Sequence, residues 1–463
     1  MIPISIHKII TVCKGKMILE GTKDQVNEIS TDTRKMKEES LFVPLIGAFF
    51  DGHQFILQAM ERGAIGALVQ KGQEFPLGKL NDFYVIEVED TLQALKEIGR
   101  HYRQNSNIPF IGVTGSTGKT TTKDMIAGIL ETNFNVLKNE GNLNNQIGLP
   151  LTLFNLEPCH EIGVLEMGMN SLGEILSLAK TVQPHIAVIT NVGFSHIEHL
   201  GSQENILTAK MEITTRLREK DYLLINGDDP FLKTVKEESK TYRIITFGID
   251  PSNDIYAENL VCLGEVGYRF DVMIQKKKHT FQVRQPGIHN VYNGLVALWV
   301  GLHYQMTPLA IQKGFDRLEL SKMRLEIVTY GDVKVINDAY NASPDSMKAA
   351  ITVLNQSTGI RKIAILGDIL EMGSFAEEGH RRIGSFIATS PVDYLITVGK
   401  SAQWIAREAV EQGFSQAHIY QTPSNDLAIK VLKTLLSPRD VVLVKGSRGM
   451  KMEEIVNFIQ ERS

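Results

Sequence analysis

The 463-residue chain contains 43% hydrophobic and 22% charged residues, a composition typical of a folded protein of about three domains. Its net charge of −4 excludes a broadly basic surface, so we expect neither nucleic acid nor an anionic membrane as a partner. The three cysteines form no Cys-x-x-Cys pair, which argues against a zinc site or a disulfide framework and favours a reducing, cytoplasmic compartment. Because there is no signal-peptide pattern and no apolar run of about 18 residues, we expect no membrane insertion.

The first unit is expected to span residues 1–103. Strand-like runs lie at 40–45, 66–70 and 83–88, with helical patterning between them. The polar stretch "HYRQNSNIP" (101–109) is interpreted as a linker that ends at Pro109.

The second unit is expected to span 104–319 and to alternate strands with helices. After "FIGVTG", strand-like runs lie at 135–138, 162–167, 185–190, 222–226 and 243–248, and helical segments include 118–131, 204–218 and 290–304. This alternation predicts an α/β fold with a mostly parallel sheet covered by helices on both faces. Residues 254–284 alternate in polarity with turns, which predicts a small antiparallel addition.

The third unit, 320–463, repeats the α/β rhythm and predicts a Rossmann-like domain. Its strand-like runs lie at 333–338, 361–368, 393–399 and 440–446, and all four end in Gly or Asp. In open α/β sheets, ligands bind at the carboxyl ends of the strands, so these ends are candidate sites.

The stretch "IGVTGSTGKTTTKDMIAGIL" (111–130) has the pattern of a strand, a glycine-rich turn and a helix, which binds phosphate on backbone N–H groups. It departs from the usual phosphate-loop pattern because Val113 stands where the first glycine is required. Lys119 would neutralise nucleotide phosphates and Thr120 would hold Mg²⁺. The alternative is a glycine- and threonine-rich turn without a ligand.

Other candidates are ambiguous when taken singly. Glu166 ends a strand, where a carboxylate suits Mg²⁺, but it is equally consistent with a solvated strand end. His196 lies in a loop with Glu198 and His199, and Lys210 lies in a helix whose pattern favours a solvated face. Asn290 or Asn293 could simply cap a helix. Arg324 and Asp338 are equally open, and Lys445, Ser447 and Arg448 form either an anion clamp or a basic surface turn.

Twelve motifs in sequence order decide between these alternatives. They are "STDTR", "LFVPLIGAFFDGHQFI", "GVTGSTGKTTTKDM", "GNLNNQIGLPLTL", "EMGMN", "NVGFSHIEHLGS", "AKMEI", "NGDDP", "GIHNVYNGLVA", "NDAYNASPDSM", "LGDILEMG" and "VKGSRGMKMEEIV". Nearly the whole chain therefore resembles the Mur ligases, which build the peptide of bacterial cell-wall precursors. Within that family it is most similar to the branch that adds D-alanyl-D-alanine. Two small departures are Asn337, where relatives commonly have Asp, and "NASP" in place of Asn-Ala-Asn-Pro.

The resemblance implies roles for individual residues. Catalysis would rest on Lys119, Lys210 and His196, and Mg²⁺ would be held by Thr120, Glu166, His196 and a carbamylated Lys210. ATP would contact Gly115, Ser116, Thr117, Gly118, Lys119, Thr120, Thr121, Asn290, Asn293, Arg324 and Asp338. The other substrates would contact Ser30, Thr31, Asp32, Thr33, Arg34, Asp51, Gly52, His53, Asn142, Asn144, Asn145, Tyr340, Asn341, Lys445 and Arg448.

The implied activity is ATP-dependent ligation of D-Ala-D-Ala to UDP-MurNAc-tripeptide by a monomer, for peptidoglycan synthesis. The first domain would bind the UDP part and the third would bring the dipeptide. Two alternatives remain. A folylpolyglutamate-type ligase shares the ATP core but lacks the "STDTR…DGH" domain, and an ATP switch module would hydrolyse ATP without ligation.

Overall fold

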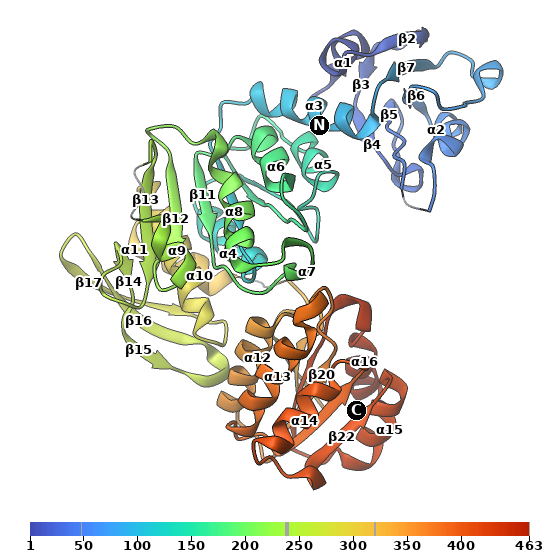
Figure 1. The fold of residues 1–463 in the computed structure, drawn as a ribbon. Helices are drawn as coiled ribbons and strands as arrows, with labels where there is room; N and C mark the ends of the chain where they lie inside the picture. Colours follow the sequence, from blue (N-terminus) through green and yellow to red (C-terminus); the bar gives the residue numbers. More distant parts are fainter. Residues whose placement is uncertain (48, 237–239, 319–320, 463) are drawn as a thin grey trace.

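The computed structural model describes residues 1–47, 49–236, 240–318 and 321–462 (Figure 1). Among the described residues, three larger sheets of five, seven and six strands follow one another along the chain with their helices, and two smaller sheets of two and three strands accompany them. This confirms the expected α/β class. The boundary expected between residues 319 and 320 lies outside the described residues.

The first sheet has five strands in the order β2-β7-β6-β5-β4. Neighbours from β4 to β7 pair in parallel, and β2 pairs with β7 antiparallel. The elements are β1 (Ile4–Ser5), α1 (Ile6–Cys13), β2 (Lys16–Leu19), β3 (Gln25–Val26), β4 (Glu28–Ser30), β5 (Ser40–Phe42), α2 (Ile56–Glu61), β6 (Ala64–Gln70), β7 (Tyr84–Val88) and α3 (Thr91–Gln104).

Helix α3 runs through the start of the expected linker at 101–109, so that interpretation was wrong for residues 101–104. The buried Arg103 explains the difference. Its Nε donates to Val182 O at 2.5 Å and a terminal nitrogen donates to Gln183 O at 3.2 Å. These bonds attach the end of α3 to the central unit, which favours helix over a free linker.

The central sheet has seven strands in the order β14-β13-β12-β11-β8-β10-β9, and all its pairs are parallel. Its strands are β8 (Phe110–Thr114), β9 (Val136–Lys138), β10 (Ile162–Glu166), β11 (Ile186–Ile189), β12 (Tyr222–Asn226), β13 (Arg243–Gly248) and β14 (Ile255–Tyr256). Its helices are α4 (Lys119–Leu130), α5 (Gly148–Phe154), α6 (Glu174–Val182), α7 (Ile197–Leu200), α8 (Gln203–Met211), α9 (Pro230–Val235), α10 (His289–His303) and α11 (Pro308–Arg317).

Helices cover both faces of this sheet, as expected. One apolar cluster packs α4 and α10 against β8, and another packs α5, α6 and α8 against the opposite face. The expected helix at 204–218 ends at Met211 and continues as the 3-10 turn η4 (Glu212–Arg216). Strand β8 lies between β10 and β11, where the strand order reverses, and ligands of such sheets bind at that point.

The antiparallel addition is confirmed as a three-stranded sheet of β15 (Glu258–Cys262), β16 (Tyr268–Ile274) and β17 (Lys277–Val283). The turn η5 (Gly264–Val266) joins its first two strands and reaches the third unit.

The third sheet has six strands in the order β18-β19-β23-β20-β21-β22. Its elements are β18 (Glu326–Tyr330), β19 (Val333–Asp338), α12 (Pro344–Gln356), β20 (Lys362–Gly367), α13 (Ala376–Ala388), β21 (Tyr394–Val398), α14 (Gln403–Glu411), β22 (Ile419–Thr422), α15 (Asn425–Leu435), β23 (Val441–Lys445) and α16 (Glu453–Glu461). The two edge strands β18 and β22 were not predicted, because their half-exposed residues lack the apolar runs of the inner strands.

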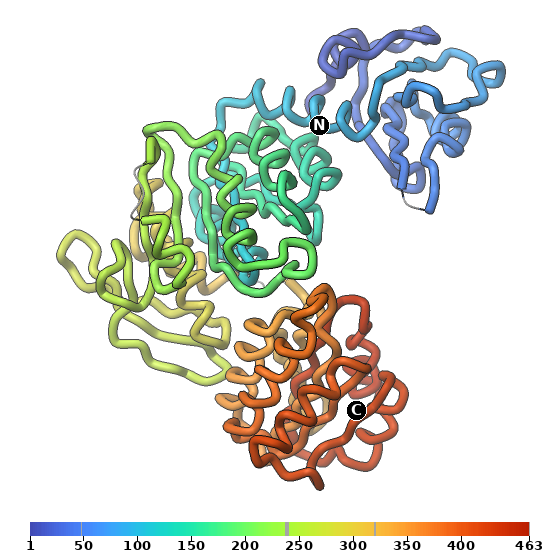
Figure 2. The backbone as a smooth tube through the Cα atoms, in the orientation of Figure 1, coloured from blue at the N-terminus to red at the C-terminus, as the bar shows by residue number. Residues whose placement is uncertain are grey.

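The first and third units stand apart, with the central unit joined to each (Figure 2). Within the described ranges, no helix has the length and apolar character needed to cross a membrane.

Candidate active site

The glycine-rich turn between β8 and α4 is shaped by two glycines in the left-handed region. Gly118 precedes the helix with φ 77°, and Gly115 has φ 152°. A Cβ on Gly115 would lie 1.8 Å from Thr190 Oγ1, so only glycine fits there. The first-turn N–H groups of α4 have no carbonyl partners within the helix, which makes this end an anion site.

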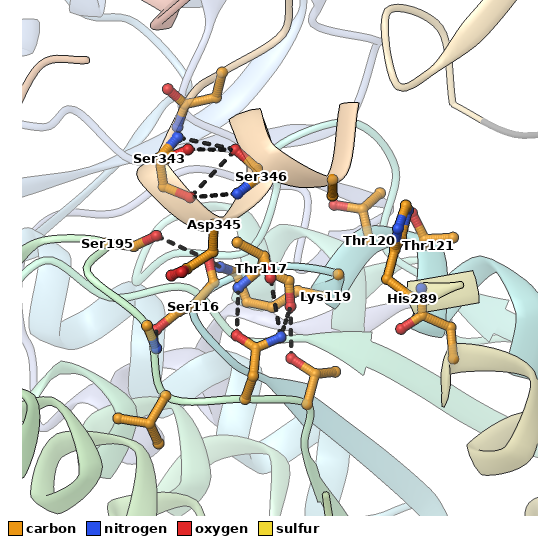
Figure 3. Close-up of a pocket in the computed structure, with 18 of the residues that line it drawn as sticks. Ser116, Thr117, Lys119, Thr120, Thr121, Ser195, His289, Ser343, Asp345 and Ser346 are labelled. Carbon is orange, nitrogen blue, oxygen red and sulfur yellow. Dashed lines mark hydrogen bonds between the residues drawn. The ribbon is translucent and has the colours of Figure 1, made fainter. Parts of the chain in front are cut away.

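The turn is held open by Asn191, which sequence reasoning did not single out. Ser116 N–H donates to Asn191 O at 3.1 Å, and Thr117 N–H donates to Asn191 Oδ1 at 2.9 Å. Figure 3 shows Ser116, Thr117 and Lys119 of the phosphate loop, residues 115–121. The available signal was the position of Asn191 just after β11, at the ligand-binding edge of the sheet.

Lys119 folds back over the phosphate loop. Its Nζ donates to Gly115 O at 2.8 Å, and burial lowers the pKa of the ammonium against the opposing effect of Glu166. A cation in this position can stabilise phosphate oxygens bound on the loop.

Glu166 is 2% exposed, which excludes the alternative of a solvated strand end. Its two carboxylate oxygens accept from Thr120 Oγ1 and from Asn144 Nδ2, each at 2.7 Å. A hydroxyl and a carboxylate in contact at the phosphate loop are the oxygen ligands that Mg²⁺ prefers, so these residues fit the expected metal.

His196 of the central unit contacts Glu371 of the third unit. Its Nδ1 lies 2.9 Å from Glu371 Oε2 in the third unit, and Glu198 N–H donates to Glu371 O at 3.4 Å. Burial lowers the pKa of His196, so the ring is neutral at pH 7 and its Nε2 can serve as a ligand.

Lys210 is 1% exposed, so the expected solvated face was wrong. Its Nζ forms no hydrogen bond with any residue that the structure describes. Burial and, secondarily, the nearby Lys119 hold its pKa well below the usual value, although Asp229 acts in the other direction. Lys210 lies outside the cavity lining, next to the residues that form it.

A cavity of about 870 Å³ opens between the central and third units. It brings together most of the expected ATP, metal and peptide residues, namely 116–121, Asn142, Asn144, Asn145, Glu166, His196, Asn290, Asn293, Arg324, Asp338, Tyr340, Asn341 and Lys445. Its lining also includes groups that sequence reasoning missed, among them Asp229, His289, Asp345 and Glu371.

On the α10 side of the cavity, neither asparagine is a helix cap, because α10 begins at His289 after Ile288. Instead Asn293 Oδ1 accepts from Thr122 Oγ1 at 3.0 Å, and its Nδ2 donates to Asn290 at 3.0 Å. Burial lowers the pKa of His289 to about 4, so this wall is uncharged at neutral pH.

The cavity lining also includes Arg324 and Tyr340, and the Arg324 guanidinium lies 4.0 Å from the centre of the Tyr340 ring. The stacked pair offers a flat surface of the kind that accepts a nucleobase.

The sequence left Lys445, Ser447 and Arg448 as either an anion clamp or a basic surface turn, and the two cations have different surroundings in the structure. The buried Lys445 ammonium bonds Asp338 and donates to Asn341 O at 2.9 Å. Arg448 is outside the cavity and pairs with Glu453 at 2.9 Å. The two cations are only three positions apart in sequence, but Lys445 is the last residue of β23 and faces the cavity, whereas Arg448 follows in the next turn and lies outside it.

The candidate residues of the first unit do not line the cavity. Asp32 caps a short 3-10 turn and pairs with Arg34 at 2.8 Å. His53 is 2% exposed, with Nδ1 2.5 Å from Asp51 and Nε2 accepting from Gln70 N–H. His53 therefore holds the loop at 51–55 in shape, and its ring has no free nitrogen for a ligand.

Comparisons with known proteins assign the family. Models of the Mur ligase middle domain, the Mur ligase glutamate ligase domain and the Mur ligase catalytic domain match residues 113–301, 323–448 and 25–103. The chain belongs to the Mur ligase family. This confirms the resemblance seen in the motifs.

Relatives of known activity match along the full chain. UDP-N-acetylmuramoyl-tripeptide–D-alanyl-D-alanine ligase of Bacillus subtilis is 40% identical, over 100% of this chain and 99% of the relative. MurF from Acinetobacter baumannii superposes with a TM-score of 0.90 at 29% identity, covering 99% of each chain. MurF ligase from Thermotoga maritima in complex with ADP gives a TM-score of 0.81 at 26% identity, over 94% of this chain and 97% of that one.

Proposed function

We propose that this chain is an ATP-dependent ligase that joins D-Ala-D-Ala to UDP-MurNAc-tripeptide for peptidoglycan synthesis. The observation that carries the proposal is the cavity, in which the phosphate loop of the central unit faces α12 and Glu371 of the third. The names of the full-length relatives supply the substrates.

The reaction has two balanced steps. A carboxylate oxygen of the tripeptide attacks the γ-phosphorus of ATP, and ADP leaves. The amine of the dipeptide then attacks the acyl carbon, the C–O bond to phosphate breaks, and inorganic phosphate and one proton are released. Lys119 and the N–H groups of α4 stabilise the phosphate charge in both steps.

Thr120, Glu166 and His196 would hold Mg²⁺, with Lys210 contributing as a carbamate. Bound Mg²⁺ would offset the charge of the transferring phosphate. The buried Lys210, without a hydrogen-bond partner in the described ranges, supports the carbamate, because burial lowers the pKa of its ammonium group and so favours the neutral amine that reacts with CO₂.

The three domains, 1–103, 104–319 and 320–463, would bind the UDP part, ATP and the dipeptide. The residues at 30–34 and 51–53 stand outside the cavity, which is consistent with a separate site for the nucleotide end of the acceptor. We place the enzyme in the cytoplasm, as a monomer, and light scattering of the purified chain tests the last point.

A phosphate-release assay with ATP, UDP-MurNAc-tripeptide and D-Ala-D-Ala tests the function. We expect phosphate release only when all three substrates are present. We also expect Lys119→Ala to lower the rate of release by about 10²-fold or more. Lys138→Ala, an exposed pair member outside the cavity, is the control. Phosphate release at the same rate with and without the dipeptide would indicate an ATP switch. Phosphate release that requires folate substrates would indicate the folylpolyglutamate alternative.

A further inference from the structure

The carboxylates of the cavity differ in how they are paired. The lining contains Glu166, Glu174, Asp228, Asp229, Asp338, Asp345 and Glu371. Six of these seven accept at least one hydrogen bond of 3.1 Å or shorter from described residues. The exception is Asp345, whose only such contact is with Phe194 N–H at 3.4 Å. It forms no ion pair with any described residue.

Asp345 comes from the third unit but lies against the phosphate loop. It occupies the first turn of α12, after the Ser343 cap and Pro344. A Cβ on Gly193 would be 2.1 Å from Asp345 Oδ2 and 3.4 Å from Ser116 Cβ, and Gly193 N–H donates to Ser116 Oγ at 2.8 Å. Figure 3 shows the Asp345 side chain reaching toward Ser116 and Ser195.

The Asp345 carboxylate is near the charges of Lys348 and Arg382 but forms no ion pair with either, so it can still bind a cationic ligand. Such a ligand would also offset the repulsion between this carboxylate and a phosphate bound on the loop. We propose that Asp345 binds the ammonium group of the incoming amine substrate and directs its nitrogen toward the acyl phosphate on the loop, where the ammonium releases one proton to solvent before the free amine attacks. This rests on the proposed function. An ammonium presents three N–H donors to one carboxylate, whereas a divalent cation needs several oxygen ligands.

The position of Asp345 at the edge of the cavity also explains why the carboxylate that binds the amine belongs to α12. The amine must reach the acyl carbon after the phosphate is bound, and Asp345 is carried by the unit proposed to deliver the dipeptide. Its exposed side chain leaves room for a ligand on the cavity side. An ammonium held there would lie between the third unit and Ser116.

The test compares an amine with a neutral analogue. Steady-state kinetics give the KM of D-Ala-D-Ala, and competition gives the inhibition constant of a dipeptide analogue with a hydroxyl in place of the amino group. For Asp345→Asn we expect KM to rise about 10- to 100-fold, since a hydrogen bond between charged groups is lost. The inhibition constant of the hydroxyl analogue, the KM of ATP and the Mg²⁺ concentration for half-maximal rate should change less than about 2-fold.

Asp426→Asn is the matched control, since it removes a carboxylate from the exposed first turn of α15 in the same unit. An unchanged KM for D-Ala-D-Ala would overturn the proposal. Equal weakening of amine and hydroxyl ligands would indicate a structural role, and a shifted Mg²⁺ requirement would indicate a metal ligand; either result also overturns it. If Asp345→Asn fails to fold, Asp345→Ser is measured in the same way. A wild-type enzyme that forms no product with these substrates would instead contradict the proposed function.

Discussion

At the scale of single residues, the site depends on two lysines that respond differently to burial. Burying a charged ammonium costs free energy, and Lys119 offsets part of that cost by donating a hydrogen bond to Gly115 O at 2.8 Å. Lys210 is more deeply buried and has no such bond within the described residues, and the charge of Lys119 adds to the destabilisation of its ammonium form. A buried cation without a partner is costly, so Lys210 is expected to be neutral or chemically modified.

We predict that Lys210 carries a carbamate. Lys210→Ala should lose most ligase activity while ATP binding survives, because Lys210 lies outside the cavity lining. Short carboxylic acids should restore part of the rate by replacing the lost carboxylate. Wild-type protein equilibrated with ¹³C-bicarbonate should show a carbamate NMR signal that is absent in Lys210→Ala. Glu204→Ala, at an exposed position of the same helix, is the control. Full activity of Lys210→Ala together with no carbamate signal would contradict the prediction.

The sequence located most of the residues of the cavity but not their partners. The glycine-rich motif predicted that Lys119 and Thr120 lie at the start of a helix. The end of a strand-like run predicted that Glu166 lies at the same edge of the sheet. The contacts of Asp345 and Glu371 with the 193–198 loop could not be predicted, since they join segments more than 150 residues apart through the packing of two units. The burial of Lys210 was missed because a helix pattern shows which residues are polar, not which neighbour covers them.

At the scale of elements, α3 shows why boundaries were harder to predict than strands. The inner strands of each sheet are apolar runs and were found, because burial on both faces requires such runs. The end of α3 is polar, and its helical state depends on Arg103, which bonds carbonyls at the end of α6. Residues 101–104 therefore have the composition of a linker but are helical because Arg103 contacts the central unit.

We predict that Arg103→Ala destabilises the attachment of the first unit to the central one. It would leave the Val182 and Gln183 carbonyls without their donors and remove the guanidinium that lies 4.3 Å from the Phe110 ring centre. The expected cost is about 3 kcal/mol, seen as a lower melting temperature by calorimetry. Arg100→Ala on the same helix is the control, because the ion pair that Arg100 forms within the described residues is with Glu97 of the same helix. Equal melting temperatures for the two variants would contradict this account.

At the scale of the whole molecule, the described residues of the third unit contact the central one at several places, among them Ser321 Oγ, which donates to Asp124 at 2.9 Å. Two further contacts lie on either side of α12. One is the cavity edge, where His196 meets Glu371. The other is the turn η5, where the Glu265 carboxylate bonds Lys334 and accepts from Thr358 N–H at 2.9 Å. Gln356 also donates to Tyr268 Oη at 2.9 Å. Together these contacts define the angle at which α12 meets the phosphate loop, on which ligation would depend.

We predict that Glu265→Ala increases the population of more open arrangements. The loss leaves Lys334 and Thr358 N–H without their acceptor from the central unit, while the contact between His196 and Glu371 is exposed at one edge and cannot alone fix the angle. Hydrogen bonds to charged groups contribute about 1.5–3 kcal/mol, enough to shift such an equilibrium about 10-fold or more. Small-angle X-ray scattering of the ligand-free variant should give a larger radius of gyration, and kcat should fall more than the affinity for ATP. Asp316→Ala breaks a pair within the central unit, with Arg284, and should leave both quantities unchanged. A Glu265→Ala variant with the wild-type radius of gyration and kcat would show that the cavity edge alone sets the arrangement.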